Sequence, residues 1–385
     1  MVVTRTYLTV CGLPSRISRS VIQRGSITSA NIAGNRPPLV SVIIPAYNSA
    51  RYIGETLNST FAQTLRDYEV ILVNSSSPDT PQLEQVLGKY QNRIHYIKQE
   101  DRGVSGDRNT GMRNAQGQFL AFPDSDDIWL PNFLADQVKF FDENPSLDMS
   151  SADCIYFGDA NVIDVSWHHL IGQSWLSRNP TESPVTLEKL LPTHGGAFPS
   201  FVLLRKATAL KVGFFDEDLR LLEDYHYWLR LVYWGGHFAY LRKVLGKRRI
   251  HPESLTYDRS VVLPHALTAL KKFLATLEPS GREASLVRRE IALGQSRLAL
   301  RTGRRKLAMR DYEGATKSFA EAQAAVPSRK VRLALLGLRW APQSTRWAIS
   351  RWDEHRAGSS GSIKTPPAAR SLNRPTSSAV RRLPR

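Results

Sequence analysis

The chain has 385 residues, of which 42% are hydrophobic, and a formal net charge of +17. This composition is enough to bury a full-sized core, and two cysteines, Cys11 and Cys154, are too few for a disulfide framework. The positive charge lies at the two ends, because residues 38–260 carry 22 basic and 27 acidic side chains, whereas residues 1–37 carry five basic and none acidic. With no nucleic-acid-binding motif in the sequence, the charge does not make the central segment a nucleic-acid binder, and we expect no nucleic-acid partner.

The first part of the central segment alternates apolar strands with helices. Runs rich in β-branched residues predict strands, and apolar residues three or four apart predict helices. Strands are expected over 38–45, 68–74, 93–99 and 118–122, with helices over 51–63, 81–92 and 131–145 and a loop that becomes a helix over 103–117. Such alternation predicts a mostly parallel α/β sheet.

Polar residues follow three of these strands, in the sequences PAYN, NSSSPD and DSDD. Ligands bind at the carboxyl ends of parallel strands, so the three tails are expected to face one crevice. In the third tail Asp124 and Asp126 are two residues apart and point the same way, while Asp127 points elsewhere. Paired carboxylates suit Mg²⁺ or Mn²⁺ bound together with substrate phosphates. The sequence therefore predicts a metal-assisted phosphate site, and the alternative is a turn whose aspartates cap the next helix.

The rest of the chain changes character twice. Residues 151–251 predict a mixed-sheet half that forms an acceptor pocket, with one helix over 222–235. Residues 261–356 predict a helical extension in which 310–327 resembles one helix of a tetratricopeptide repeat. The Leu-, Trp- and Arg-rich residues 331–352 either lie on an anionic membrane or pack on the protein. Residues 357–385 are expected to be a disordered basic tail, and 1–37 a basic leader.

Four stretches together resemble a family 2 glycosyltransferase of GT-A fold: SVIIPAYNSARYIGETLNS, GVSGDRNTGMRNAQGQFLAFPDSDDIWLP, GFFDEDLRLLEDYHYWLRL and RIHPESLT. They occur in the family's order within 38–260, which we take as the catalytic domain. The resemblance implies a Rossmann-type sheet flanked by helices. It also implies an inverting transferase that uses a nucleotide-diphosphate sugar and a divalent metal, Mg²⁺ or Mn²⁺.

The resemblance also implies roles for individual residues. Asp224 would be the general base, beside Glu223, and Asp126 the main metal ligand, with Asp124 on the metal or the ribose. The nucleotide sugar would be bound by Pro45, Ala46, Tyr47, Ser75, Arg108, Asn109, Asp124 and His251. Acids in the first turn of a helix are also favoured by the helix dipole alone, which is the competing explanation for Glu223 and Asp224.

Two segments depart from the family pattern. Asn74 and Ser75 stand where the family has an acidic pair, and Asp107 stands where it tends to have a small residue. Loss of a charge-assisted hydrogen bond costs roughly 1–3 kcal/mol, so donor affinity or donor identity is affected. The alternatives left open are a nucleotide-sugar-binding protein impaired in catalysis and a nucleotidyltransferase.

The sequence also suggests where the protein acts. No apolar run approaches the roughly 20 residues of a membrane-spanning helix, and we identify no signal peptide. We expect a cytoplasmic protein, peripheral at the inner face of the membrane, that transfers single sugars to a glycan, lipid or protein-linked acceptor.

Overall fold

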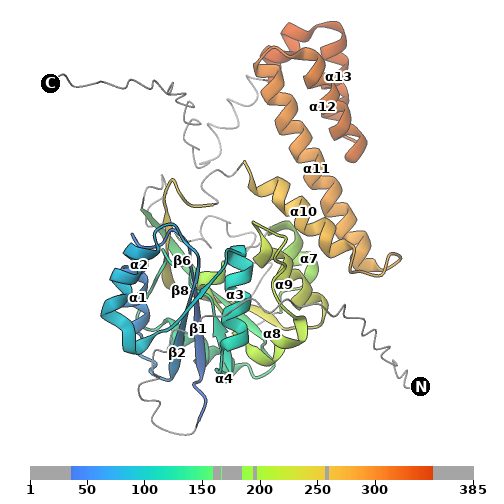
Figure 1. Ribbon diagram of the computed structural model, residues 1–385. Helices are drawn as coiled ribbons and strands as arrows, with labels where there is room; N and C mark the ends of the chain where they lie inside the picture. Colours follow the sequence, from blue (N-terminus) through green and yellow to red (C-terminus); the bar gives the residue numbers. More distant parts are fainter. Residues whose placement is uncertain (1–35, 159–165, 167–183, 194–196, 256–259, 350–385) are drawn as a thin grey trace, which may run out of the picture.

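The computed structural model describes residues 36–158, 166, 184–193, 197–255 and 260–349. One eight-stranded sheet, in the order β3-β2-β1-β4-β7-β6-β8-β5, forms its centre (Figure 1). The strands are β1 (Val40–Ala46), β2 (Tyr68–Ser75), β3 (His95–Gln99), β4 (Phe119–Ala121), β5 (Ile128–Trp129), β6 (Met149–Gly158), β7 (Val202–Arg205) and β8 (Phe238–Ile250).

The first four strands are parallel, as the alternating pattern predicts. β1 lies between β2 and β4, with Val40 opposite both Tyr68 and Phe119, so the carboxyl ends of these strands reach the same edge. β7 then runs antiparallel between β4 and β6, while β8 pairs parallel to β6 and antiparallel to β5. The sheet therefore consists of a parallel half joined to a mixed half, the α/β class expected from the sequence.

Helices cover both faces of the sheet. Those before the C-terminal extension are α1 (Ile53–Phe61), α2 (Thr80–Leu87), α3 (Gly103–Asn114), α4 (Phe133–Glu143), α7 (Leu187–Leu190), α8 (Lys206–Val212) and α9 (Glu223–Tyr233). One core holds α1 and α4 against β1 residues such as Val42 and Ile44, and a second holds Ile43 with α3 and α9. This split follows from β1 itself, since alternate side chains of a strand point to opposite faces.

α3 packs unusually close to β1. A Cβ atom placed on Gly111 would lie 2.2 Å from Cγ2 of Ile43, so any side chain at this position would force Ile43 or the helix to shift. The helix starts at Gly103, so the predicted loop at the beginning of this segment is wrong. Its glycines and asparagine are poor helix formers, and tertiary packing outweighs that propensity.

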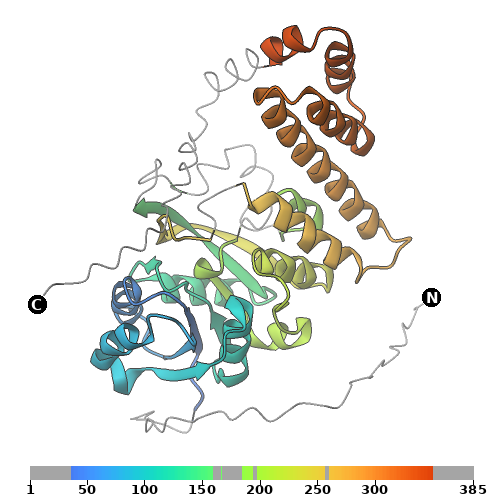
Figure 2. The same ribbon diagram turned by 45° about the horizontal axis from the view of Figure 1, so that its top comes forward.

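The C-terminal extension is helical: α10 (Val262–Leu274), α11 (Arg282–Ala308), α12 (Tyr312–Ala325) and α13 (Arg329–Trp340). α10 packs on α9, and Lys272 on it pairs with Asp216 and Asp218 at 2.8 and 2.9 Å. In both views α11 leads away from the sheet and carries α12 and α13 at its far end (Figures 1 and 2). The domain limits predicted from sequence stay predictions, and the basic leader and tail lie mostly or wholly outside the described residues.

None of the helices in the described part of the chain is long and apolar enough to cross a bilayer.

Candidate functional site

The first of the three polar tails is the segment after β1. Pro45 and Ala46 are buried inside the strand, whereas Tyr47 beyond it is 48% exposed. Asn48, in the next position, has a left-handed φ of 49°. It donates its backbone N–H to Oγ of Ser77, which is 2.8 Å away in the segment that follows β2. Of the three residues predicted here, only Tyr47 offers an open surface on which a base can stack.

The loop after β4 spreads its three aspartates over three partners. Asp124 pairs with Arg108, and Asp126 pairs with His251, whose Nε2 lies 2.8 Å from Oδ2 of Asp126. Asp127 is buried and accepts the backbone N–H of Arg249 at 2.8 Å, so it points away from the other two. Asp124 and Asp126 are only partly buried. The pair predicted to bind metal is therefore accessible, and the third aspartate fastens β8 to the loop.

Arg108 joins the two acidic clusters. Its Nη2 lies 2.8 Å from Oδ1 of Asp124 and its Nη1 lies 2.5 Å from Oε1 of Glu223. The guanidinium is 2% exposed, and Asp224 is close enough to raise its pKa together with the other two carboxylates, although burial lowers it. The acidic start of α9 and the aspartates after β4 thus lie on opposite sides of one side chain, within a single site.

The surroundings of Asp224 favour its protonated, neutral form. It is 9% exposed, and burial, followed by the charge of Glu223, raises the pKa of Asp224 to about 8 against the opposing effect of Arg108. Oδ1 accepts the backbone N–H of Tyr225 at 2.6 Å. Among the described residues nothing hydrogen-bonds to Oδ2, so that oxygen is available to a substrate hydroxyl. Leu222 immediately before Glu223 has φ of 61°, a strained backbone of the kind that recurs at functional sites.

β8 supplies cations that the sequence analysis did not assign. Arg249 donates Nε to the backbone oxygen of Asp126 at 2.9 Å and pairs with Glu55. Arg248 lies near Asp127 and Asp124, whose charges, with Tyr156, raise its pKa although burial lowers it. Arg248 directly precedes the Arg-Ile-His motif and Arg249 is its first residue, so their position beside this motif is the sequence feature that could have assigned them to the site.

The two departures from the family pattern touch each other. Ser75, at the end of β2, donates its hydroxyl to Oδ1 of Asp107 on α3, and Gln99 donates to the same oxygen at 2.8 Å. Asp107 is 1% exposed, and burial raises its pKa to about 7. An acid missing from the end of β2 is thus present beside it, delivered by the neighbouring helix.

Asn109 is buried, and its side-chain amide is bound within the protein. It is 1% exposed, and its amide donates to the backbone oxygen of Phe215 and to Glu217 and accepts the N–H of Phe215, at 2.8–3.0 Å. With these bonds made, both amide hydrogens are used. Asn109 therefore clamps the segment before α9 to α3 and has no donor left for a nucleotide.

The donors present fit a hard divalent cation that takes most of its ligands from substrate. Nowhere in the described ranges do three or more His, Cys, Asp or Glu side chains form a metal cluster. Asp126 and His251 nevertheless lie in hydrogen-bond contact, and burial and the charge of Asp124 raise the pKa of Asp126. Mg²⁺ sites commonly use one or two carboxylates plus phosphates and water, so this set is sufficient.

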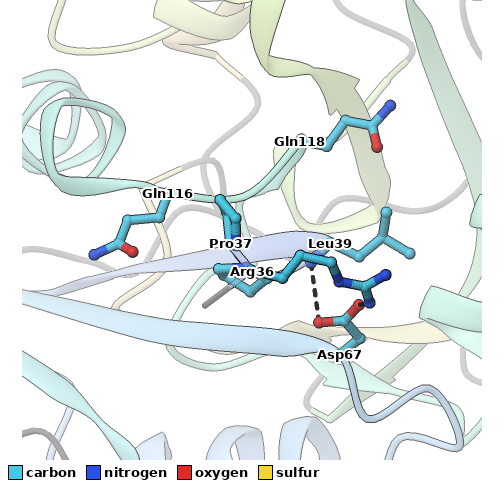
Figure 3. A pocket seen from close by; sticks show the side chains of 7 residues that line it. Arg36, Pro37, Leu39, Asp67, Gln116 and Gln118 are labelled. Atoms are coloured by element: carbon cyan, nitrogen blue, oxygen red, sulfur yellow. Dashed lines mark hydrogen bonds and ion pairs between the residues drawn. The ribbon is translucent and has the colours of Figure 1, made fainter. Parts of the chain in front are cut away.

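A separate pocket lies at the opposite end of β1. Arg36, Asp67, Gln116 and Gln118 are among its lining residues, and Arg36 pairs with Asp67, which also accepts the N–H of Leu39 at 3.2 Å (Figure 3). It lies at the amino end of the strand, away from the crevice, and brings together no catalytic group. We assign it no part in the site.

Comparison with known proteins identifies a matching family and several similar relatives. The model of glycosyl transferase family 2 matches residues 41–211. An uncharacterized glycosyltransferase of Rickettsia conorii is 32% identical over 220 residues, 56% of this chain but 34% of its own length. One of Methanocaldococcus jannaschii is 30% identical over 220 residues, 55% of this chain and 71% of its own. The chain thus spans about a third of the longer relative.

Two solved structures have a similar fold. Residues 1–349 of S. aureus TarS in complex with UDP-GlcNAc match with a TM-score of 0.54 at 21% identity, covering 83% of this chain and 92% of that one. The mannosyltransferase PcManGT from Pyrobaculum calidifontis, in complex with GDP-Man and Mn²⁺, matches with a TM-score of 0.52 at 17% identity, covering 85% and 89%.

Proposed function

Because the chain belongs to glycosyltransferase family 2, we propose that it transfers one sugar from a nucleotide-diphosphate sugar to a hydroxyl of a glycan, lipid or protein-linked acceptor, with inversion. The observation that carries the proposal is the bridge of Arg108 between Asp124 and Glu223. In a direct displacement the acceptor oxygen and the leaving group must lie at the same carbon atom. The bridge holds Asp124, assigned to the donor, and Glu223, assigned to the acceptor side, on one guanidinium, and so keeps the two substrate sites next to each other.

In this proposal Asp224 is the general base. Oδ2 of Asp224 takes the proton of the acceptor hydroxyl as that oxygen attacks the anomeric carbon, and the bond from this carbon to the phosphate oxygen breaks. Because the attack comes from the side opposite the leaving nucleoside diphosphate, the configuration inverts. The raised pKa of Asp224 suits a base that must accept a proton near neutral pH, and Glu223 positions Arg108.

On the donor side we assign the leaving group to the aspartates after β4. A Mg²⁺ or Mn²⁺ ion held by Asp126 and His251, with Asp124 beside them, would stabilise the charge that develops on the departing diphosphate. Arg249 fixes the loop by binding the backbone oxygen of Asp126. Support comes from the Mn²⁺ in the mannosyltransferase complex and from the UDP-GlcNAc in the TarS complex, both of which share this fold.

A binding protein impaired in catalysis is the second candidate, favoured by Ser75 at the end of β2. The contact with Asp107 weakens that alternative, because a carboxylate still lies at this strand end. We assign Ser75 and Asp107 together to the nucleoside, with Tyr47 as its stacking surface.

The experiment is a titration of a panel of nucleotide sugars by calorimetry, with Mn²⁺ and with a chelator, followed by assay of sugar transfer to cell-envelope acceptors. We expect metal-dependent binding of at least one donor. Asp107→Ala should weaken that binding about tenfold, since it removes the carboxylate that accepts hydrogen bonds from Ser75 and Gln99. Donor binding without turnover in the presence of any acceptor would favour the second candidate, and no binding of any donor would overturn both.

A further inference from the structure

Helix α13 has two apolar faces. Val331 and Leu338 are 7% and 6% exposed and join Leu307 and Phe319 in the small core that holds α11, α12 and α13 together. A second apolar group is open: the exposed fractions are 68% for Leu333, 49% for Leu336 and 77% for Trp340. A helix of this length needs one face for packing, so the second face requires another explanation.

The open residues form one stripe. At roughly 100° per residue, Leu336, Trp340 and Leu333 fall within about 60° of one another, on the side of the helix opposite Val331. Packing the helix on α12 therefore leaves the whole stripe outside. Contiguous apolar side chains of this kind mark interaction surfaces, unlike single exposed leucines.

The charge around the stripe identifies its partner. Residues 326–349 contain five basic side chains, Arg329, Lys330, Arg332, Arg339 and Arg346, and no acidic one. Arg332 and Arg339 are exposed and lie on one side of the stripe by the same helical geometry. An apolar stripe with Leu and Trp next to arginines is the pattern of a helix that lies in the interface of an anionic bilayer.

Like charge disfavours the other occupants. Residues 1–37 carry five basic and no acidic side chains, and residues 350–385 carry eight basic and two acidic ones, so both ends of the chain are net positive and neither complements the stripe. A second copy would bring the same basic helix. Nucleic acid would satisfy the arginines and gain nothing from Leu333 and Leu336.

We propose that this face of α13 docks on an anionic membrane surface, with Leu333, Leu336 and Trp340 at the boundary of headgroups and acyl chains and Arg332 and Arg339 on lipid phosphates. α13 lies at the far end of the helical arm in both views (Figures 1 and 2). The 27 residues of α11 span about 40 Å, so the arm sets the height of the catalytic domain above the lipid. The inference is independent of the proposed sugar transfer.

The test is flotation of the full-length protein with vesicles of phosphatidylcholine, alone or rich in phosphatidylglycerol. The variant combines Leu333→Ser, Leu336→Ser and Trp340→Ser, which remove the apolar stripe and leave every charge in place. Its matched control combines Leu210→Ser and Trp234→Ser, at positions that are 55% and 69% exposed on the catalytic domain.

We expect the wild-type protein to prefer anionic vesicles, the stripe variant to lose about tenfold in partitioning, and the control to change less than twofold, with the melting temperatures of all three alike. Equal partitioning of stripe variant and wild type would overturn the proposal, because the basic ends alone would then explain binding. Self-association of the wild type but not of the stripe variant, measured by sedimentation, would also overturn the proposal, because the stripe would then be an interface between two copies. Displacement of both proteins from the vesicles to the same extent by a DNA duplex would overturn it too, because binding would then depend on the basic side chains and not on the stripe.

Discussion

Asp224→Asn should separate catalysis from stability, because the carboxylate that serves the reaction is expensive to ionise inside the fold. Its pKa is about 8 in the folded protein against an ordinary value of 3.8. A tenfold change in a proton-binding constant corresponds to about 1.4 kcal/mol, so at pH 7 the folded state is penalised by up to roughly 4 kcal/mol relative to a neutral side chain of the same shape. Asparagine keeps an oxygen for the backbone N–H of Tyr225 and removes the penalty.

The sign follows from the protons bound. Between pH 4 and 8 the folded protein holds a proton on Asp224 that the unfolded chain releases, so this group's stabilising contribution is present below about pH 4 and is lost as the pH rises through 8. The advantage of Asp224→Asn should therefore grow by about 1.4 kcal/mol per pH unit from pH 5 and level off near 8. Urea unfolding of both proteins at five pH values measures it.

The same substitution should lower the rate of sugar transfer although it raises the stability. Loss of the base should lower the rate about 10²- to 10⁴-fold while donor binding persists, and wild-type activity should rise with pH through about 8. Asp216→Asn is the control for the unfolding series. Burial raises the pKa of Asp216, but the hydrogen bonds from Lys272 and from the backbone N–H of Asp218, together with the charge of Lys272, lower it overall, so that variant should be destabilised at neutral pH. A flat stability difference, or retained turnover in Asp224→Asn, would refute the assignment.

Three further changes test the site and its frame. Arg108→Lys replaces the planar guanidinium by an ammonium group that cannot bind two carboxylates at once. We therefore expect the free energy of unfolding in urea to fall by about 3 kcal/mol and the turnover number to fall at least tenfold. A variant as stable as the wild type would show that the bridge is dispensable. Asp126→Ala should abolish the metal-dependent thermal shift caused by donor, and a retained shift would place the ion elsewhere. Gly111→Ala should cost about 1–3 kcal/mol through its clash with Ile43, whereas Gly54→Ala, where the nearest atom is 3.6 Å away, should be neutral or stabilising; equal melting temperatures would contradict the close approach of α3.

The parts of the site readable from sequence were those with a local signature. The apolar runs ending in PAYN and DSDD predicted strands and their polar tails, and the alternation along DSDD predicted that Asp127 points away from Asp124 and Asp126. These patterns depend on the period of the backbone, which neighbouring residues determine.

Contacts between distant residues carried no such signal. Arg108 and Glu223 are 115 positions apart, and Ser75 and Asp107 are 32 apart, so their pairing depends on how the helices dock. The same docking turned a glycine-rich segment into α3 from its first residue, against its propensity. Asn109 looked like a ligand residue by motif, and only the packed fold showed its amide bound to Phe215.

α3 reaches both parts of the sheet with three consecutive side chains: Asp107 is tied to β2, Arg108 to the loop after β4 and the start of α9, and Asn109 to the segment before α9. A hinge between the two halves would have to break the bonds of Arg108 to Glu223 and of Asn109 to Phe215 and Glu217 together. These bonds resist relative movement of the two halves, so we expect substrates to be admitted by movement of the loops at the rim. Enzymes with such a frame change specificity by altering loop length, since remodelling the helix would misalign both reactants together.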